Sequence, residues 1–340
     1  MQNEKLSLAF DKMALLCYYR NEFRHAYTYG EIALKYNPNE KRLQENMEWY
    51  KSKYVPKKVE KCAWVTLLSD NAYINGLVVL ARSLQEVETK YPLYVAVTDE
   101  VSQENLEVLS KLCLPIIHLD IVVPPKMELQ DAPEVITTLD AYGWHKALCK
   151  LRIFGLEQFD KLVFIDADVI VKNNMDELFD MPHMTTCRDC WDFEGQFGDT
   201  PSLSSGMMVI EPDKTVAENL LDFLEVFDSN GKMVHDQWII QEYYKGWEEC
   251  SSLHLSPYYA VWTTRFDPNR PEYYYHMHKI KSIHMIDTKP WRVNKQYFLD
   301  YIDIYPIYSK LSLQYIDILN YTIQDLANKG ITSTNLKIIN

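Results

Sequence analysis

Apolar residues recur at helical spacing through the first fifty positions of the chain. Over residues 5–54 they repeat every three or four positions, which predicts helices that pack through one face. A proline in Asn37-Pro38-Asn39 interrupts the repeat, and residues 42–54 resume it as a further helix. The next four residues, Val55-Pro56-Lys57-Lys58, are predicted to form a linker.

The helical segment over residues 1–55 is similar to one tetratricopeptide unit. An aromatic residue, small residues and a terminal proline stand at the spacing of that repeat: Ala14, Phe23, Ala26, Ala33 and Pro38. A single unit cannot form a solenoid, because each repeat needs neighbours to bury its apolar face. Two interpretations therefore stay open. The segment is either a helical hairpin packed on the main domain or a site that docks a protein partner.

Downstream of the linker, apolar runs alternate with amphipathic stretches. Buried strands are predicted at residues 62–68, 93–97, 116–119 and 161–165, and helices at 72–87, 103–112 and 144–159. This alternation predicts an α/β fold, with a mainly parallel sheet flanked by helices. Such sheets bind ligands at the carboxyl ends of their strands. We expect this domain to span residues 60–296 and a C-terminal helical tail to span 297–340.

Composition and charge narrow the range of partners. The 340 residues contain 35 Lys and Arg against 48 Asp and Glu, a formal net charge of −13, which disfavours nucleic acid. The chain has no apolar run of the roughly 18 residues that cross a membrane, and its N-terminus lacks the pattern of a signal peptide. The seven scattered cysteines fit a reducing compartment, so we expect a cytoplasmic protein. Cys187 and Cys190 form one C-x-x-C without a second pair, which favours ordinary thiols over a zinc site.

The strand predicted at 161–165 leads directly into two carboxylates, Asp166 and Asp168. Side chains at that spacing share one face of a strand, and two like charges so close repel unless a cation lies between them. Carboxylate oxygens suit Mg²⁺ or Mn²⁺, and such an ion can bind the phosphates of an anionic substrate. Aspartyl phosphatases of the haloacid-dehalogenase type and nucleotide-sugar transferases both place D-x-D after a strand. The phosphatase motif normally ends the first strand and precedes an acidic pair, and this chain has neither feature.

Later segments favour nucleotide-sugar transfer. Ser204-Ser205-Gly206 is predicted to form a flexible turn before another buried strand. His235-Asp236-Gln237 opens an apolar helical stretch, Ile283-His284 ends a short strand, and Lys289-Pro290-Trp291 follows. A histidine nitrogen can complete an oxygen-rich metal shell, and a lysine can neutralise a phosphate. No G-x-G-x-x-G follows the first strand, so a dinucleotide site is not supported.

Taken together, these motifs resemble family 8 glycosyltransferases, the group of glycogenin and galactinol synthase. The resemblance covers roughly residues 60–295 and is carried by Val65-Thr66-Leu67, Asn71-Ala72-Tyr73, Leu148-Cys149-Lys150-Leu151-Arg152, Ile165-Asp166-Ala167-Asp168 and Asp176-Glu177-Leu178-Phe179-Asp180. It implies the GT-A nucleotide-diphospho-sugar transferase fold. It also implies retaining transfer of a sugar from a UDP-sugar to a hydroxyl of a polyol, glycan or protein, with Mn²⁺ or alternatively Mg²⁺. Glucose is the first candidate sugar, followed by galactose and N-acetylglucosamine.

The resemblance also implies roles for single residues. Asp166, Asp168 and His284 match the metal ligands. The donor-binding positions are Thr66, Asn71 and Tyr73 for uridine, Ala167 within the D-x-D, Ser205 and Gly206 beside the sugar, and Lys289 on the diphosphate. Asp236 and Gln237 match the pair near the reacting carbon, and Lys150 matches a lysine that reaches the donor. Asp236 as a nucleophile and front-face attack guided by the leaving phosphate both stay open.

Some positions depart from the family pattern. The segment from His284 to Lys289 is one residue short, lacks glycine and contains Asp287, and Met233 stands where glycogenin-like chains carry an acidic residue. No self-glucosylated tyrosine is assigned, although Tyr273-Tyr274-Tyr275 forms an aromatic cluster. The loop from Arg188 to Thr200, with Asp189, Asp192 and Glu194, is either a cover over the sugar or a solvated acidic loop. These departures leave an alternative: a catalytically impaired, nucleotide-sugar-binding scaffold that acts through its helical N-terminus.

Overall fold

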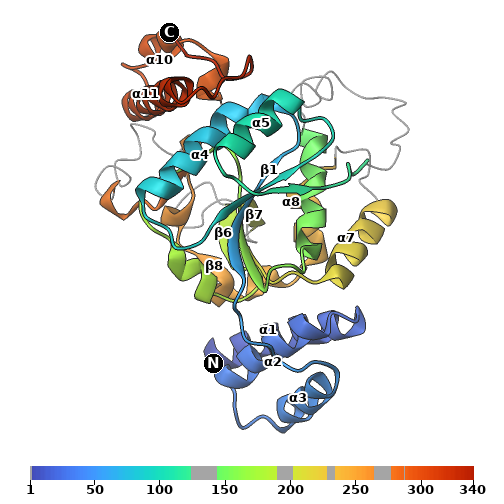
Figure 1. The fold of residues 1–340 in the computed structure, drawn as a ribbon. Coiled ribbons are helices and arrows are strands. Elements are labelled where there is room, and N and C mark those ends of the chain that lie inside the picture. Colours follow the sequence, from blue (N-terminus) through green and yellow to red (C-terminus); the bar gives the residue numbers. More distant parts are fainter. Residues whose placement is uncertain (1, 124–143, 190–201, 228–233, 264–276, 287) are drawn as a thin grey trace, which may run out of the picture.

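The computed structural model describes residues 2–123, 144–189, 202–227, 234–263, 277–286 and 288–340. A central sheet lies between helices, with α1–α3 at one end of the molecule and α10 and α11 at the other (Figure 1). The helices are α1 (Gln2–Tyr19), α2 (Phe23–Tyr36), α3 (Lys41–Lys53), α4 (Ile74–Glu86), α5 (Gln103–Lys111), α7 (Lys214–Val226), α8 (Asp236–Tyr243), α10 (Lys295–Asp300) and α11 (Pro306–Asn328). The strands are β1 (Cys62–Leu68), β2 (Leu93–Val97), β3 (Ile116–His118), β4 (Lys161–Ile165), β5 (Val169–Val171), β6 (Thr186–Asp189), β7 (Ser202–Ile210), β8 (His254–Leu255), β9 (Val261–Trp262) and β10 (Ser282–His284).

Within the described residues the main sheet has the strand order β3-β2-β1-β4-β7-β6-β8. The first four of these strands are parallel, and β7 runs antiparallel to both β4 and β6. A small second sheet has the order β5-β10-β9. The α/β fold with a mixed, mainly parallel sheet flanked by helices and an N-terminal helical segment is therefore confirmed.

Strand formation follows the apolar runs closely. The predicted strands at 62–68, 93–97 and 161–165 have the observed bounds of β1, β2 and β4, and β3 ends one residue earlier than predicted. All five residues of β4 are buried, because neighbouring strands cover its edges and helices cover its faces. Such a central strand presents the residue that follows it, Asp166, at the carboxyl edge of the sheet.

Two predicted elements differ in the structure. The segment after 144 is a 3₁₀ helix, η2 (Trp144–Gly155), rather than an α-helix to 159. It ends where α7 packs closely, since a Cβ at Gly155 would lie 2.9 Å from the Cβ of Ala217. Ser204-Ser205-Gly206 lies inside β7 rather than in a turn before it. The reason is that β7 is paired on both sides, and the carbonyl of Gly206 accepts a hydrogen bond from the Asp166 amide at 2.9 Å.

The N-terminal helices pack against the main domain. Phe10, Met13 and Cys17 share one apolar core with Trp247 and Cys250. Polar contacts reinforce this packing: an Arg24 guanidinium nitrogen donates to the Asp160 carbonyl at 2.6 Å, and His25 Nε2 lies 2.9 Å from the Glu211 carbonyl oxygen. The segment therefore has the form of a hairpin packed on the domain, the first of the two interpretations drawn from its sequence.

At the opposite end, α11 packs on α4, and the last residues of the chain run back along the domain. Tyr315 and Leu319 of α11 are buried in a cluster that also holds Val78 and Val79 of α4. Asn75 binds the backbone at Asn335 and at Lys337, which fastens this tail beside the start of α4. Among the described helices, none is long and apolar enough to cross a membrane.

Candidate functional site

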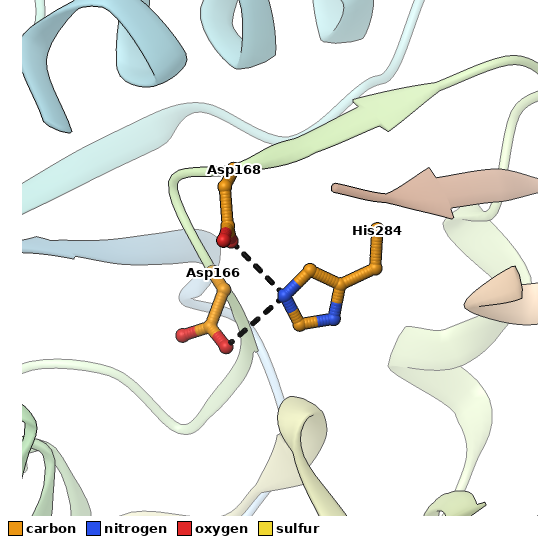
Figure 2. Close-up of side chains that lie close together, drawn as sticks. All are labelled: Asp166, Asp168 and His284. Atoms are coloured by element: carbon orange, nitrogen blue, oxygen red, sulfur yellow. Dashed lines mark ion pairs between the residues drawn. The ribbon is translucent and has the colours of Figure 1, made fainter. Parts of the chain in front are cut away.

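The turn between β4 and β5 brings three polar side chains to one point. Asp166 and Asp168 stand in that turn, and His284 ends β10, which pairs with β5 so that His284 lies opposite Val169. One ligand atom of each residue lies within 4.8 Å of the others. His284 Nε2 is 3.0 Å from Asp168 Oδ1 and 3.8 Å from Asp166 Oδ2, as the dashed lines in Figure 2 show. The three predicted metal-ligating residues are therefore close enough to share one ion.

Two glycines allow the surrounding chain to approach this cluster. A Cβ at Gly206 would lie 2.8 Å from His284 Cε1 and 3.1 Å from Asp166 Oδ2. A Cβ at Gly76, in α4, would lie 2.6 Å from the carbonyl oxygen of Ala167. Only a residue without a side chain fits at these two positions, so β7 and α4 can close around the turn that carries the carboxylates.

Each of the two carboxylates also holds a buried lysine. Lys150 Nζ lies 3.1 Å from Asp166 Oδ1 and 2.7 Å from Asp236 Oδ2. Lys289 Nζ lies 2.5 Å from Asp168 Oδ2 and also donates to the carbonyls of Met285 and Ile286 at 2.6 and 3.1 Å. Both lysines are almost fully buried, so their charges are neutralised by protein carboxylates rather than by water.

Burial and ion pairing set the protonation of this cluster. Burial alone would raise the pKa of Asp168, but Lys289 and His284 hold it well below its ordinary value. Burial alone would lower the pKa of Lys150, but Asp166 and Asp236 raise it above its ordinary value. Burial raises the pKa of Asp166, and the neighbouring Asp168 adds to that rise while Lys150 opposes it. Lys150 is therefore charged, and Asp168 is ionised at neutral pH.

Asp236 and Gln237 stand at the start of α8, next to the same point of β7. His235 caps this helix through its ring nitrogen, 3.4 Å from the Trp238 amide. The Ser205 hydroxyl donates to Asp236 Oδ2 at 2.7 Å, and its amide donates to Gln237 Oε1 at 3.2 Å. Burial opposes ionisation of Asp236, yet Lys150 lowers its pKa, so a second negative charge faces the cluster.

These groups line a cavity of about 420 Å³. Of the residues singled out from the sequence, its walls include Tyr73, Lys150, Asp166, Ala167, Asp168, Ser205, Gly206, Asp236, Gln237, His284 and Lys289. Two predicted uridine contacts do not line it. Thr66 is fully buried in β1, and its hydroxyl has no hydrogen-bond partner within the described part of the chain. Asn71 Oδ1 accepts from the Ser102 amide and from Asn105 Nδ2, which ties it to the start of α5.

Other lining residues were not picked out from the sequence, among them Ser69, Ala147, Trp262 and Ile286. Trp262 pairs in register with His284, so both side chains rise on the same face of the small sheet. The sequence offers no signal for it, because its contact depends on a pairing between two short, distant strands. Several earlier expectations lie outside the described residues: Cys190, Asp192, Glu194, Met233, Tyr273, Tyr274, Tyr275 and Asp287.

The donor set fits a hard divalent cation. Two carboxylates and one imidazole match the oxygen and nitrogen ligands that Mn²⁺ or Mg²⁺ takes, and Gly206 leaves space beside them. The described lining contributes three carboxylates against two lysine ammoniums, a net charge of −1 without the histidines. Such a cavity repels an anionic ligand unless a cation enters it with that ligand.

Comparison with known proteins gives the family. The sequence profile of glycosyl transferase family 8 matches residues 64–295. The chain is 30% identical to galactinol synthase 1 of Ajuga reptans over 49% of this chain and 56% of that protein, and 26% identical to glycogenin-1 of Caenorhabditis elegans over 67% and 50%. It thus spans about half the length of these relatives. The solved galactosyltransferase LgtC, in complex with donor and acceptor sugar analogues, aligns with a TM-score of 0.48 and 13% identity over 78% of this chain and 99% of that one. Because the family profile covers more than half of its residues, the chain belongs to glycosyl transferase family 8.

Proposed function

We propose that the protein is a retaining glycosyltransferase that moves a sugar from a UDP-sugar to a hydroxyl acceptor with Mn²⁺, or alternatively Mg²⁺. The observation that carries this proposal is the grouping of Asp166, Asp168 and His284 within 4.8 Å in a cavity of a family 8 chain. Glucose is the first candidate sugar, and a polyol, glycan or protein is the acceptor class. The retaining outcome rests on the family alone.

The charge of the cavity supports a metal-dependent anionic donor. With a net charge of −1 in its described lining, the cavity disfavours a UDP-sugar on its own. Asp166, Asp168 and His284 would hold the ion. When bound, that ion would supply positive charge to the diphosphate as it leaves the sugar. The lining would then be complementary to its ligand.

The contacts of the residues at the start of α8 support a role beside the reacting sugar. Asp236 is fixed by Lys150 and by the Ser205 hydroxyl, so its carboxylate keeps one orientation. Negative charge there stabilises positive charge that develops at a sugar carbon as the glycosidic bond breaks. Gln237 presents its amide beside Asp236. The sequence-based roles of Lys150, Lys289, Tyr73, Ala167 and Gly206 as donor contacts stay predictions, as do those of Thr66 and Asn71.

The test is a panel of UDP-sugars scored for hydrolysis and for transfer, with and without Mn²⁺. We expect UDP release from at least one donor, strictly dependent on the ion, and retention of anomeric configuration in the product. Absence of both binding and hydrolysis for every donor would reject the proposal. Release of inorganic phosphate without UDP binding would instead support the phosphatase interpretation.

A second candidate is favoured by the contacts of Lys289. Because its ammonium is bound to Asp168 and to two carbonyls, it is not directed at a ligand in the cavity. A scaffold that binds nucleotide without turnover would show the same arrangement. Binding of UDP with Mn²⁺, combined with no hydrolysis or transfer across the panel, would favour the scaffold.

A further inference from the structure

A buried asparagine of α5, Asn105, links the C-terminal tail (residues 330–340) to the turn η1 (Asn71–Tyr73), which precedes α4. Its amide nitrogen donates to Asn71 Oδ1 at 2.8 Å, and its amide oxygen accepts from the Ser333 hydroxyl at 2.8 Å. These two partners lie 34 and 228 residues away along the chain. Asn105 is 0% exposed, so water does not freely replace either bond when its partner is removed.

The turn η1 carries Tyr73 into the wall of the cavity, and two distant parts of the chain hold this turn. On one side, Asn71 Oδ1 accepts from the start of α5, at the Ser102 amide (2.9 Å) and at the asparagine just described. On the other side, the Trp291 indole nitrogen donates to the Ala72 carbonyl at 3.0 Å. The Trp291 ring also packs edge-on against Tyr73, with ring centroids 5.8 Å apart. The position of Tyr73 therefore depends on both supports.

The tail that holds Asn105 also crosses to α4. Asn75 Nδ2 donates to the Asn335 carbonyl at 2.9 Å, and the Lys337 amide donates to Asn75 Oδ1 at 3.2 Å. The Asn335 amide donates to the Ser333 hydroxyl oxygen at 3.1 Å, while the hydroxyl hydrogen goes to Asn105. This stretch of the tail therefore fastens α4 and α5, the two helices that contact η1, to each other.

The tail also supports the cavity wall through packing. Leu336 packs on an apolar cluster that includes Ala167, the residue between the two carboxylates, and Tyr73 packs on the same cluster. Neither Asn105 nor Ser333 is among the described residues that line the cavity. Any effect of these two residues on a ligand must therefore pass through η1 and this cluster.

We propose that Asn105 and Ser333 are positioning residues, which set the affinity of the site for a UDP-sugar by holding η1 and Tyr73 in the binding conformation. This deepens the proposed function and rests on it. A ligand that binds only when a segment is correctly placed loses affinity in proportion to the fraction of molecules in which that segment is misplaced. The groups proposed to act on the reacting sugar lie elsewhere in the cavity. We therefore expect a change in donor affinity and KM, with kcat nearly unchanged.

The test compares two adjacent hydroxyls of the tail that both donate to α5. Ser333→Ala removes the buried bond to Asn105, whereas Thr334→Val removes a solvent-exposed bond of 2.7 Å to Glu104. Titration calorimetry with Mn²⁺ gives the UDP dissociation constant, and UDP release gives KM and kcat. We expect Ser333→Ala to raise the dissociation constant and KM about fivefold, with kcat changed less than about twofold. The effect is moderate because Asn335 Nδ2 still lies 3.4 Å from Asn105 Oδ1. Thr334→Val should match the unmodified chain.

Three further variants test each half of the link. Asn105→Asp keeps an oxygen for Ser333 but sets a carboxylate oxygen against Asn71 Oδ1, so we expect a larger rise in the UDP dissociation constant, about twentyfold. Ser333→Thr keeps the hydroxyl and should retain most of the affinity. Ser333→Ala combined with Asn71→Ala should cause little loss beyond that of Asn71→Ala, because the link is already broken.

The outcomes separate positioning from stability. A purely structural role would lower the urea midpoint of Ser333→Ala and leave the UDP dissociation constant of the folded protein unchanged, which overturns the inference. Equal effects of Ser333→Ala and Thr334→Val, or a fall in kcat without a change in KM, also overturn it. Circular dichroism shows whether each variant is folded at the assay temperature.

The unmodified chain distinguishes this inference from the proposed function. Failure to bind UDP with Mn²⁺ rejects the proposed function, and this inference with it. Binding without turnover favours the scaffold, and the dissociation constants of the variants then decide on the positioning role. Normal turnover with no difference between Ser333→Ala and the unmodified chain overturns the inference alone.

Discussion

The strand pair β4–β7 carries an ionic cluster at each end, and the two clusters differ in charge balance. At the start of β4, Lys161 lies 3.3 Å from Glu211 Oε1, and Arg24 of α2 lies 3.3 Å from Glu211 Oε2. One carboxylate there faces two cations. At the other end, three carboxylates, Asp166, Asp168 and Asp236, share two lysines.

The comparison separates a structural cluster from the cluster that we propose to be functional on the same pair of strands. Glu211 has a cation on each oxygen, and the N-terminal helices cover it, so nothing further is required to balance it. The carboxylate-rich end opens on a cavity instead, and His284 Nδ1 there is buried and finds no hydrogen-bond partner among the residues that the structure describes. A divalent cation that enters the cavity can balance this surplus negative charge.

Among substitutions in the two clusters, we expect the largest effect at Asp168. Asp168→Ala removes a proposed metal ligand and leaves the Lys289 charge unbalanced in the site. We expect ion-dependent UDP-sugar turnover to fall by about a thousandfold, which corresponds to roughly 4 kcal/mol of transition-state stabilisation. Turnover rates at saturating Mn²⁺ check this. A variant with most of its activity would place the ion elsewhere.

At the other end of the strands, Glu211→Ala should affect folding rather than binding. The change leaves the buried Lys161 and the partly buried Arg24 without their shared counter-charge. We expect the free energy of unfolding to drop by about 3–5 kcal/mol, as for other broken buried ion pairs. Urea unfolding measures the loss, and Mn²⁺ affinity of the folded variant should stay unchanged.

A surface pair provides the control for Glu211. Glu218 pairs with Lys214 one helical turn away, and both side chains are well exposed. Glu218→Ala is expected to cost less than about 0.5 kcal/mol. Equal losses for Glu211→Ala and Glu218→Ala would contradict the structural role assigned to the Glu211 cluster.

An added methyl group should lower ion affinity at Gly206 and stability at Gly30. Gly206→Ala places a Cβ 2.8 Å from His284 Cε1, so we expect Mn²⁺ affinity to fall about tenfold, as when a partner of a metal ligand is lost. Gly30→Ala, in α2, crowds Met47 Sδ at 2.6 Å and should lower stability while leaving ion affinity unchanged. Calorimetric titration and urea unfolding of both variants test the pair. Loss of ion affinity in Gly30→Ala would contradict the prediction that this substitution affects stability alone.

The last predicted effect concerns pH. Burial lowers the pKa of His183 well below its ordinary value, and the neighbouring His25, Arg24 and Lys161 add to that shift. Below pH 6.5 the unfolded chain therefore binds a proton that the folded chain does not, so stability falls on acidification. The slope attributable to this residue is at most about 1.4 kcal/mol per pH unit.

Urea midpoints at pH 7.5 and 5.5 measure this slope for the unmodified chain and for His183→Gln. We expect the variant to lose less stability on acidification, although it is less stable at pH 7.5. His183 accepts a hydrogen bond from the Glu211 amide and contacts the Tyr244 hydroxyl, so its removal weakens the structural cluster. The same slope in both proteins would show that other groups cause the acid sensitivity.

The sequence predicted the sheet and the grouping of Asp166, Asp168 and His284 well, for a physical reason. A run such as residues 161–165 is apolar at every position, which identifies a central strand, and the acidic residues that follow it then fall at the sheet edge. His284 was placed through a family motif, and the pairing of β10 with β5 brings it to the doublet.

What the sequence did not predict depends on pairings between distant segments. Ser204-Ser205-Gly206 has the composition of a turn, but pairing with β4 and β6 makes it a strand. Asn105 Nδ2 donates a hydrogen bond to Asn71 Oδ1 and holds the Asn71 side chain at the start of α5, outside the cavity lining. This contact depends on the packing of α5. Likewise, nothing in the sequence indicates that the Lys289 ammonium donates to Asp168 and to the carbonyls of Met285 and Ile286.

The packing of α1 and α2 has a consequence for the order of assembly. These helices leave the ribosome before the rest of the domain, but their partners include Tyr243, whose carbonyl accepts a hydrogen bond from Arg20, and Trp247, whose ring is buried in the same core. Their apolar faces therefore stay without these partners until more than two hundred further residues have been synthesised. A nascent chain with such late-completed contacts exposes that apolar surface until the main domain has been synthesised.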